Sequence, residues 1–227
     1  DSTKKAFDAS IERLGGESIL PLDLYLIHWP TPEKDTYVDT FKAFQQIRDS
    51  GRAKAIGVSN FTPAHLDEII AATGVTPASN QVEMHPAFPQ ADQRAADAER
   101  GITTQAWSPI GRGEILDAEP VVAAARAHDV TPAQVVLRWH VHLGSLPLPK
   151  SGDPERQRAN LEILGFDLSD AKLRRAGLDY HDLAHVTVHP SIDELWSRLG
   201  ERRVIAFSTH TDNSFAEVEY QDGDVLL

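Results

Sequence analysis

Short apolar runs alternate with segments of helical period along the first 165 or so residues of the chain. The runs are LYLIHWP (24–30), AIGVSNF (55–61), SNQVEMHP (79–86), TTQAWSPIGRG (103–113) and LPLPKS (146–151). Strands that alternate with helices in this way predict a parallel sheet with right-handed crossovers. In such sheets and barrels ligands meet the carboxyl ends of the strands, so the polar residues that end the runs are predicted to gather at one mouth.

The same periods predict where each element lies. Strands are expected over 23–29, 55–60, 79–84, 103–109 and 146–151, and helices over 2–14, 36–50, 63–72, 90–100, 117–128, 131–143 and 154–164. Three of these helices open with an N-cap residue followed by Pro at the first helical position, at Thr62-Pro63, Thr131-Pro132 and Asp153-Pro154. Beyond about residue 165 the alternation gives way to a helix or turn over 170–182, a strand over 185–190, a helix over 191–199, a buried strand over 203–210 and the front of another strand at the end.

Composition narrows the class of protein. With 227 residues, 41% of them hydrophobic, the chain has the material for one α/β domain or two small ones. No apolar run approaches membrane-spanning length, and the absence of cysteine excludes disulfides, thiol nucleophiles and thiolate metal sites. A net charge of −12 argues against broad nucleic-acid binding and fits a protein that takes small ligands. We expect a cytoplasmic protein, with no metal site, and a chain that begins without Met is expected to be a fragment.

Five motifs stand in a specific order and spacing: DLYLIHWP, IGVSNF, NQVEMHP, QAWSPIGRG, and LPKS followed by Arg and Asn. In this order they make residues 1–165 resemble the aldo-keto reductases. The resemblance implies an α/β fold, a (β/α)₈ TIM-type barrel of which five of eight strands are matched here. It also implies an NADPH-dependent oxidoreductase that reduces aldehydes or ketones, with a small carbonyl substrate.

His28, at the end of the first predicted strand, is the predicted catalytic residue. By the resemblance, it orients the substrate carbonyl and stabilises the negative charge that develops on its oxygen. A neutral imidazole can donate a hydrogen bond to such an oxygen, and electrostatic stabilisation of this kind is often a large part of catalysis. A histidine that ends a strand can also be satisfied by the backbone alone, and from its position alone that alternative stays open.

The resemblance also implies the residues that bind NADPH. Three polar groups at strand ends would bond the nicotinamide carboxamide, an aromatic ring would stack on the nicotinamide, and a glycine-containing loop would fold over the pyrophosphate. Two cations and a hydroxyl near a helix N-terminus would hold the adenosine 2′-phosphate, with an amide at the adenine, which favours NADPH over NADH. In that order, the residues are Ser59, Asn60 and Gln81; Trp107; Ser108, Ile110, Gly111 and Gly113; Lys150, Ser151 and Arg156; and Asn160. Turn chemistry, a core aromatic and solvated cations are the structural alternatives.

Two departures from the family pattern bear on cofactor binding and catalysis. Ala159 stands where the family usually carries Glu or Gln at the adenine or ribose, so affinity is expected to suffer there. The general-acid Tyr, with its Lys and Asp partners, comes from the family's first three βα units, and Tyr25, Tyr37, Tyr180 and Tyr220 match no such motif. Because a positioned acid contributes about 10²–10⁴-fold, we expect impaired turnover. Five strands would also leave two open edges, which predicts self-association.

The tail resembles a different family. From about residue 164, LRRAGLDYHD, VTVHPSIDELW, RVIAFSTHT and YQDGDVLL resemble the SPOUT-class tRNA (cytidine-34/uridine-34) 2′-O-methyltransferases. The two resemblances predict a fusion of two domains, a truncated reductase barrel over 1–165 and a SPOUT-like α/β fragment over 166–227. Methyl transfer is not expected, because the Gly-rich loop and knotted segment that bind S-adenosylmethionine in that class find no match.

Two alternatives stay open beside the reductase. One is an RNA-modification protein, in which Lys172, Arg174 and Arg175 would touch tRNA phosphates, although three cations in an acidic chain are more often a solvated helix face. The other is an inactive fusion fragment without an independent fold. NADPH binding that depends on Lys150 and Arg156 would favour the reductase, and salt-sensitive tRNA binding through Arg174 and Arg175 would favour the RNA-modification protein.

Overall fold

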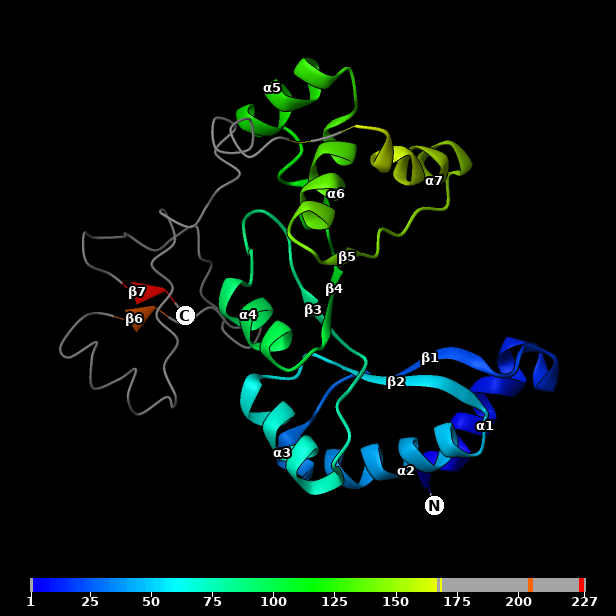
Figure 1. Cartoon of the computed structure of the whole chain (residues 1–227). Helices are drawn as coiled ribbons and strands as arrows, with labels where there is room; N and C mark the ends of the chain where they lie inside the picture. The colour runs from blue at the N-terminus through cyan, green and yellow to red at the C-terminus, as the bar shows by residue number, and fades with distance from the viewer. Residues whose placement is uncertain (1, 167, 169–203, 206–224, 227) are drawn as a thin grey trace. The chain divides into compact units, whose positions relative to one another are not determined.

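The computed structural model describes residues 2–166, 168, 204–205 and 225–226. The chain divides into two compact units, Asp1–Leu183 and Ala184–Leu227, and the expected domain boundary near residue 165 stays a prediction. In chain order the elements of the first unit are α1 (Ser2–Leu14), β1 (Leu22–Ile27), α2 (Tyr37–Asp49), β2 (Ala53–Ser59), α3 (Pro63–Thr73), β3 (Ser79–Glu83), α4 (Ala91–Glu99), β4 (Thr103–Trp107), α5 (Glu119–His128), α6 (Pro132–His142), β5 (Leu146–Pro147) and α7 (Pro154–Leu161), shown in Figure 1.

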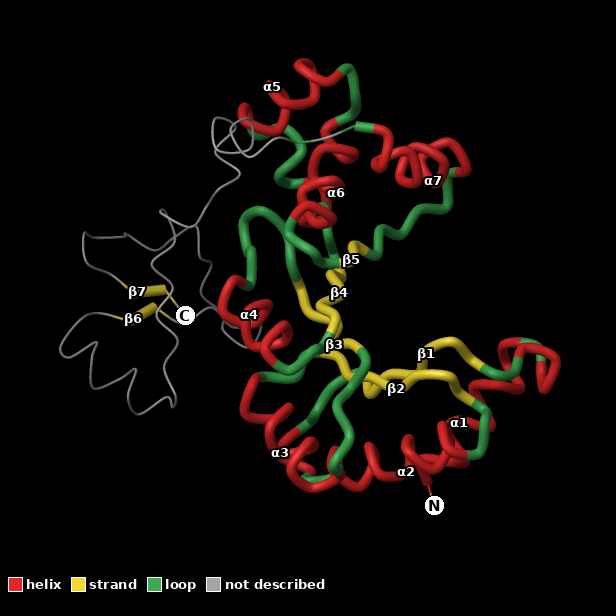
Figure 2. Tube along the Cα trace, in the orientation of Figure 1, coloured by secondary structure: helices red, strands yellow, loops and turns green. Residues whose placement is uncertain are grey.

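The strands of this unit form one parallel sheet in the order β1-β2-β3-β4-β5, as the alternation of the sequence predicts (Figure 2). One α-helix lies between successive strands from β1 to β4, and two lie between β4 and β5. The register places Ile27 opposite Val58, Ser59 opposite Gln81, and Gln81 opposite Gln105. The carboxyl ends of the strands therefore share one edge of the sheet. The outer strands, β1 and β5, are the edges of this described sheet, and the expected self-association stays a prediction.

All five strands end earlier than the sequence pattern predicts, and at β4 and β5 proline is involved. β5 covers only Leu146–Pro147 instead of 146–151, with one further hydrogen bond from Leu148 N to Ala106 O at 3.0 Å. Pro147 and Pro149 have no N–H to donate, so the ladder cannot continue toward Lys150. β4 ends at Trp107 rather than at 109, because Ser108 adopts a left-handed conformation with φ 48° before Pro109.

The predicted helix starts are confirmed at all three Pro-containing caps. The Thr62 hydroxyl accepts from His65 N at the start of α3, and the Thr131 hydroxyl accepts from Gln134 N at the start of α6. Asp153 caps α7 with its carboxylate. Helix α7 is shorter than expected, since a 3₁₀ turn over Glu162–Gly165 replaces its last residues.

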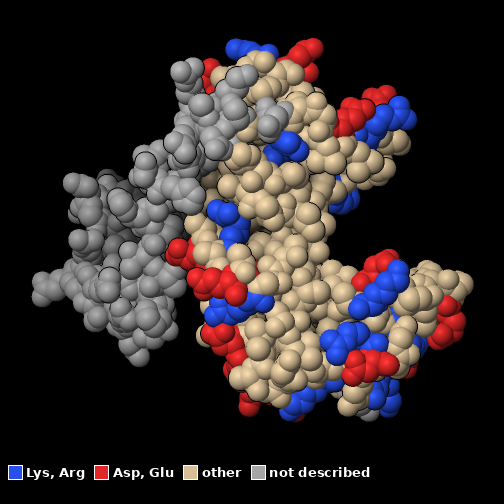
Figure 3. Space-filling view, viewed as in Figure 1, with Lys and Arg blue, Asp and Glu red and all other residues tan. Residues whose placement is uncertain are grey.

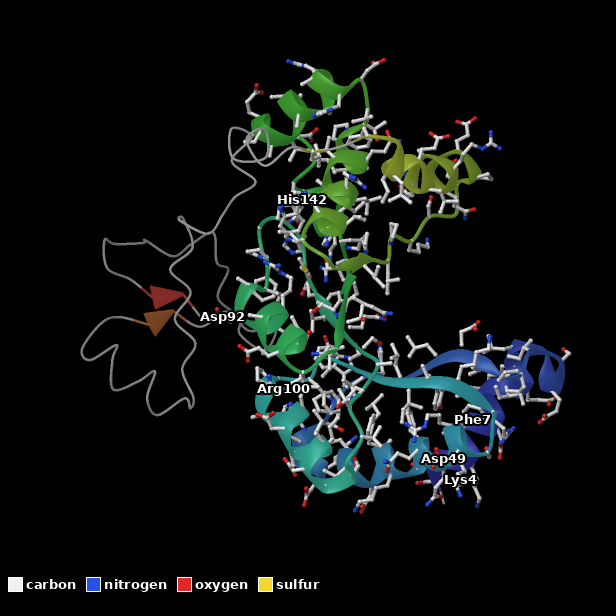
Figure 4. All side chains as sticks on the ribbon, in the orientation of Figure 1. Lys4, Phe7, Asp49, Asp92, Arg100 and His142 are labelled. Atoms are coloured by element: carbon white, nitrogen blue, oxygen red, sulfur yellow. The ribbon has the colours of Figure 1, made fainter. Side chains whose placement is uncertain are left out.

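Apolar side chains form two clusters on this sheet. The first packs α1, α2 and α3 on β1 and β2, where the Tyr25 ring lies 4.9 Å from Phe7 and 4.4 Å from Phe44 between ring centroids (Figure 4 labels Phe7 on α1). The second packs α5 and α6 on β3 and β4, with Val135 and Val136 fully buried. Both clusters hold helices against the sheet and leave the carboxyl ends of the strands to the loops.

A buried polar cluster joins β3, β4 and α4. The Asp97 carboxylate accepts hydrogen bonds from Asn80 Nδ2 at 3.2 Å and from the Thr104 hydroxyl at 2.8 Å. Burial raises the pKa of Asp97, and these hydrogen bonds partly oppose the rise. The Asn80 amide also donates to Phe61 O at 2.9 Å. This cluster therefore fixes the chain just after β2, where the first predicted cofactor residues stand.

The surface drawn in Figure 3 interleaves cationic and anionic side chains over the described residues. Arg52, for example, pairs with Asp8 at 2.6 Å and with Glu17 at 3.2 Å. Among the residues that the structure describes, no helix has the length and apolar character that a membrane crossing requires.

Only two short strands of the second unit are described. β6 (Val204–Ile205) and β7 (Val225–Leu226) pair in parallel, which confirms strand structure at these positions of the two predicted tail strands. The expected elements over 170–182, 185–190 and 191–199 lie outside the described residues, as do Arg174 and Arg175. The SPOUT-like fragment stays a prediction.

Candidate active site

The side chain of Asn60 joins the carboxyl ends of three strands. Its Oδ1 accepts from Trp107 Nε1 at 2.9 Å, and its Nδ2 donates to His28 O and to Ser59 Oγ, both at 3.1 Å. Its backbone N–H donates to Gln81 O at 2.9 Å. Asn60 has φ 62°, a left-handed conformation that Asn tolerates better than most residues. We call these five residues the strand-end network: His28, Ser59, Asn60, Gln81 and Trp107.

Within this network, Ser59 and Gln81 differ in what they can offer a ligand. Ser59 is 2% exposed, and its hydroxyl donates to Gln81 O at 2.8 Å, so it fastens β2 to β3. The Gln81 side chain is half-buried and donates through Nε2 to Gln105 Oε1 at 3.2 Å. Sequence reasoning missed Gln105, whose signal is its position two residues before Trp107 in an alternating strand, on the same face of the sheet.

His28 presents its ring at this edge while its backbone is held. The residue directly follows β1, is exposed, and gives its carbonyl to Asn60. Its ring lies 6.4 Å from that of the exposed Trp29, nearly perpendicular to it. A fixed backbone with an exposed imidazole can aim a hydrogen bond at a group bound beside the strand ends. The Asn60 amide thus links the His28 backbone carbonyl to the Trp107 indole at the edge where the parallel strands end.

The hydroxyl groups of the two described tyrosines form hydrogen bonds outside the strand-end network. Tyr25 packs between Phe7 and Phe44 in the first cluster. The Tyr37 hydroxyl donates to the Glu68 carboxylate, and burial together with that carboxylate raises the pKa of Tyr37 to about 12. The Tyr37 ring lies 5.5 Å from that of Phe61, the residue after Asn60, and Tyr180 and Tyr220 lie outside the described residues.

The predicted pyrophosphate loop, residues 108–113, is a tight double turn. Gly111 N donates to Ser108 O, and Gly113 N donates to Ile110 O, both at 2.9 Å. Gly111 and Gly113 have φ of +53° and +98°, values that favour glycine. A Cβ added to Gly111 would lie 3.4 Å from Ile115 Cγ2 and 3.6 Å from the His85 ring. The loop backbone is therefore packed closely on its inner side.

The predicted 2′-phosphate residues surround the start of α7. Lys150 and Arg156 are exposed, and the Ser151 hydroxyl accepts from Asp153 N at 3.1 Å. The Asp153 carboxylate accepts from Glu155 N at 2.8 Å and from Arg156 N at 3.4 Å, and it lies 3.9 Å from the Arg156 guanidinium. Sequence reasoning identified Asp153 as a helix cap but missed that its charge stands among the predicted phosphate ligands.

Asn160, the predicted adenine contact, lies on α7 beside an apolar hollow. The hollow has a volume of about 490 Å³ and is open to solvent. Its lining includes Asn160 together with Leu146, Pro147, Leu161 and Leu164. The Gln134 amide of α6 donates to Ala159 O at 3.0 Å and so holds α7 against α6. The roles assigned to these residues stay predictions.

Known proteins resemble this chain over its first unit. An aldo-keto reductase of Mycolicibacterium smegmatis is 53% identical over 170 residues, which cover 74% of this chain and 60% of that protein. The 2,5-diketo-D-gluconic acid reductase B of a Corynebacterium species is 51% identical over 161 residues, which cover 70% and 57%. A crystal structure of a Gox0644 mutant in complex with NADPH superposes with a TM-score of 0.73 at 44% identity, covering 78% of this chain and 64% of that one.

These comparisons concern the reductase motifs and leave the tail resemblance untested. The chain spans about 60% of the length of the curated relatives it matches. The family model for the aldo/keto reductases matches residues 1–176. The chain belongs to the aldo/keto reductase family.

Proposed function

We propose that this chain is an NADPH-dependent oxidoreductase that reduces an aldehyde or ketone at the carboxyl edge of its sheet. The observation that carries the proposal is the strand-end network, in which Asn60 links His28, directly after β1, to Trp107, at the end of β4. Such a network makes a rigid platform, and rigid platforms hold a cofactor and a catalytic side chain in fixed relation.

The residues at this edge fit a nicotinamide dinucleotide. The Asn60 and Gln81 amides can pair with a carboxamide, and the half-buried Trp107 ring can stack on the nicotinamide. The loop 108–113 brings its backbone close to a pyrophosphate, and Lys150 and Arg156 supply cations for a 2′-phosphate. The complex of the Gox0644 mutant with NADPH supports the same cofactor here.

The cofactor supplies the hydride, and the chain supplies placement and polarisation. The His28 imidazole would donate a hydrogen bond to the carbonyl oxygen and so make its carbon more electrophilic. Since Asn60 fixes the His28 backbone, the ring can reach the oxygen only by side-chain rotation. The hydroxyl groups of Tyr25 and Tyr37 bond to Ser10 and Glu68, and without a positioned acid we expect slow turnover. The Corynebacterium relative is named as a reductase of a diketo acid, which supports a carbonyl substrate.

Calorimetric titration of the purified chain with NADPH tests the proposal. We expect saturable binding that Lys150→Ala weakens about tenfold, the size of effect typical of a lost charge-assisted hydrogen bond. Lys54→Ala is the matched control, because Lys54 is also exposed but pairs with Asp23 at 2.6 Å near the amino end of β2. The proposal would be contradicted if the folded chain bound no NADPH. It would also be contradicted if Lys150→Ala and Lys54→Ala weakened NADPH binding equally.

The catalytic part needs its own assay. NADPH oxidation with a small aldehyde should be slow but measurable, and His28→Ala should lower kcat by at least about tenfold while NADPH affinity stays the same. Equal rates for the unmodified chain and for His28→Ala would show that His28 takes no part in catalysis. Substrate-independent oxidation alone would count against carbonyl reduction.

A further inference from the structure

His140 is a fully buried histidine that the proposed mechanism does not use. It lies on α6 with 0% exposure, and its Nε2 is 2.9 Å from Pro109 O. Its Nδ1 is 3.3 Å from the Ser145 hydroxyl, which also donates to His140 O at 3.0 Å. A polar ring placed in an otherwise apolar helix face thus reaches across to the loop that follows β4.

The partners of the ring define its tautomer. A backbone carbonyl only accepts hydrogen bonds, so His140 Nε2 must carry the proton and donate to Pro109 O. Nδ1 is then unprotonated, and the Ser145 hydroxyl 3.3 Å from it has a single proton, which it donates to His140 O. Burial lowers the pKa of His140 to about 4, which keeps the ring neutral at physiological pH and preserves this arrangement.

The hydrogen bond from His140 to Pro109 O holds the start of loop 108–113. Ser108 is left-handed at φ 48°, and Pro109 has no N–H, so its carbonyl is the hydrogen-bonding group that this residue offers. The His85 ring also lies close to Gly111, 3.6 Å from the place that a Cβ on that residue would take. Loop 108–113 is therefore held at its start by a buried hydrogen bond and near its middle by packing. Its internal hydrogen bonds shape the turn, and His140 fixes where the turn stands relative to α6.

We propose that His140 is a positioning residue for the pyrophosphate of the cofactor, acting through Pro109 on loop 108–113. This inference rests on the proposed function, in which that loop covers the pyrophosphate. It predicts a selective effect: loss of the His140 bond should weaken ligands that contain the pyrophosphate and spare ligands that contain only the adenosine 2′-phosphate end. A residue that acts only through stability would weaken both.

Calorimetry with NADPH and with adenosine 2′-phosphate separates these outcomes. His140→Leu removes the donor at similar volume, and we expect NADPH to bind about tenfold more weakly while adenosine 2′-phosphate changes less than twofold. His140→Gln, which can donate to Pro109 O through its amide, should recover most of the NADPH affinity. Lys150→Ala should weaken both ligands, which shows that each assay can detect a loss.

Two further variants keep the test decisive. Val136→Ala, at another fully buried position of α6, should lower stability without changing the ratio of the two affinities. Ser145→Ala removes only the hydroxyl beside Nδ1 and should give a smaller loss specific to NADPH, which covers the case that His140→Leu does not fold. Parallel losses for both ligands, or an unchanged ratio in all folded His140 and Ser145 variants, would overturn the inference and leave the proposed function standing. Failure of the unmodified chain to bind either ligand would overturn both.

Discussion

The indole N–H of Trp107 donates to Oδ1 of Asn60 at 2.9 Å, although 47 residues separate the two in sequence. The bond crosses over β3 and joins the carboxyl ends of β2 and β4. Because the same Asn60 amide donates to His28 O, the predicted stacking ring and the predicted catalytic residue share one anchor. A substitution at Trp107 should therefore change both the stacking of the nicotinamide ring and the stability of the strand ends.

Trp107→Phe keeps an aromatic face and removes the indole donor. We expect the free energy of unfolding to fall by about 1 kcal/mol, because Asn60 Oδ1 loses its partner in a half-buried site. NADPH should bind a few-fold more weakly. Urea denaturation and calorimetry measure the two effects. Trp29→Phe, at a residue 51% exposed, is the control and should change neither quantity; matching results for both variants would mean that the Trp107 bond contributes nothing.

Asp153→Asn tests the carboxylate at the start of α7. Asn caps helices as well as Asp does, so the variant removes the negative charge and keeps the cap. We expect NADPH to bind about threefold more tightly at low ionic strength, because repulsion of the 2′-phosphate is relieved, and the gain should shrink as salt is added. NADH, which lacks that phosphate, is the control ligand. An equal gain for NADH would point to a change in the loop instead of relieved repulsion.

Gly57→Ala should be strongly destabilising. A Cβ there would lie 2.7 Å from the backbone oxygen of Ser79, so β2 and β3 would have to move apart. We expect a loss of about 3 kcal/mol in the free energy of unfolding, measured by chemical denaturation. Gly165→Ala, where nothing lies within 4 Å of the added atom, should be close to neutral. Comparable stability of the two variants would mean that β2 and β3 can move apart at little cost in free energy.

Acid should weaken the fold through His140. Burial, with smaller effects of His85 and Arg94, lowers the pKa of His140 from 6.5 to about 4, so the unfolded chain binds a proton more readily. The stability that the neutral ring contributes is therefore complete above about pH 6.5 and is lost as the pH falls toward 4, by about 3 kcal/mol.

Denaturation curves at pH 7 and pH 4.5 check this expectation. The unmodified chain should lose more stability between the two conditions than His140→Gln, which has no titrating ring at that position. The comparison isolates His140 from His85, whose pKa burial also lowers, because both proteins keep His85. The same pH dependence in both proteins would show that His140 does not titrate in this range.

The sequence by itself determined the order of strands and helices, since each apolar run and each Pro-containing cap is a local signal. It also determined which side chains end the strands, because parallel strands must bring their carboxyl ends to one edge. The expectation of a strand over 146–151 overlooked that Pro147 and Pro149 have no N–H to donate, so β5 is shorter than expected.

Only the tertiary structure decided which of these side chains are exposed to a ligand and which form hydrogen bonds between strands. Ser59 ends its strand as predicted, yet its hydroxyl is buried against Gln81 O. His140 gave no signal beyond a polar ring in an apolar helix, and its partner Pro109 stands 31 residues away. Hydrogen bonds between residues distant in sequence depend on how helices and loops pack, and periodicity along one chain does not encode that packing.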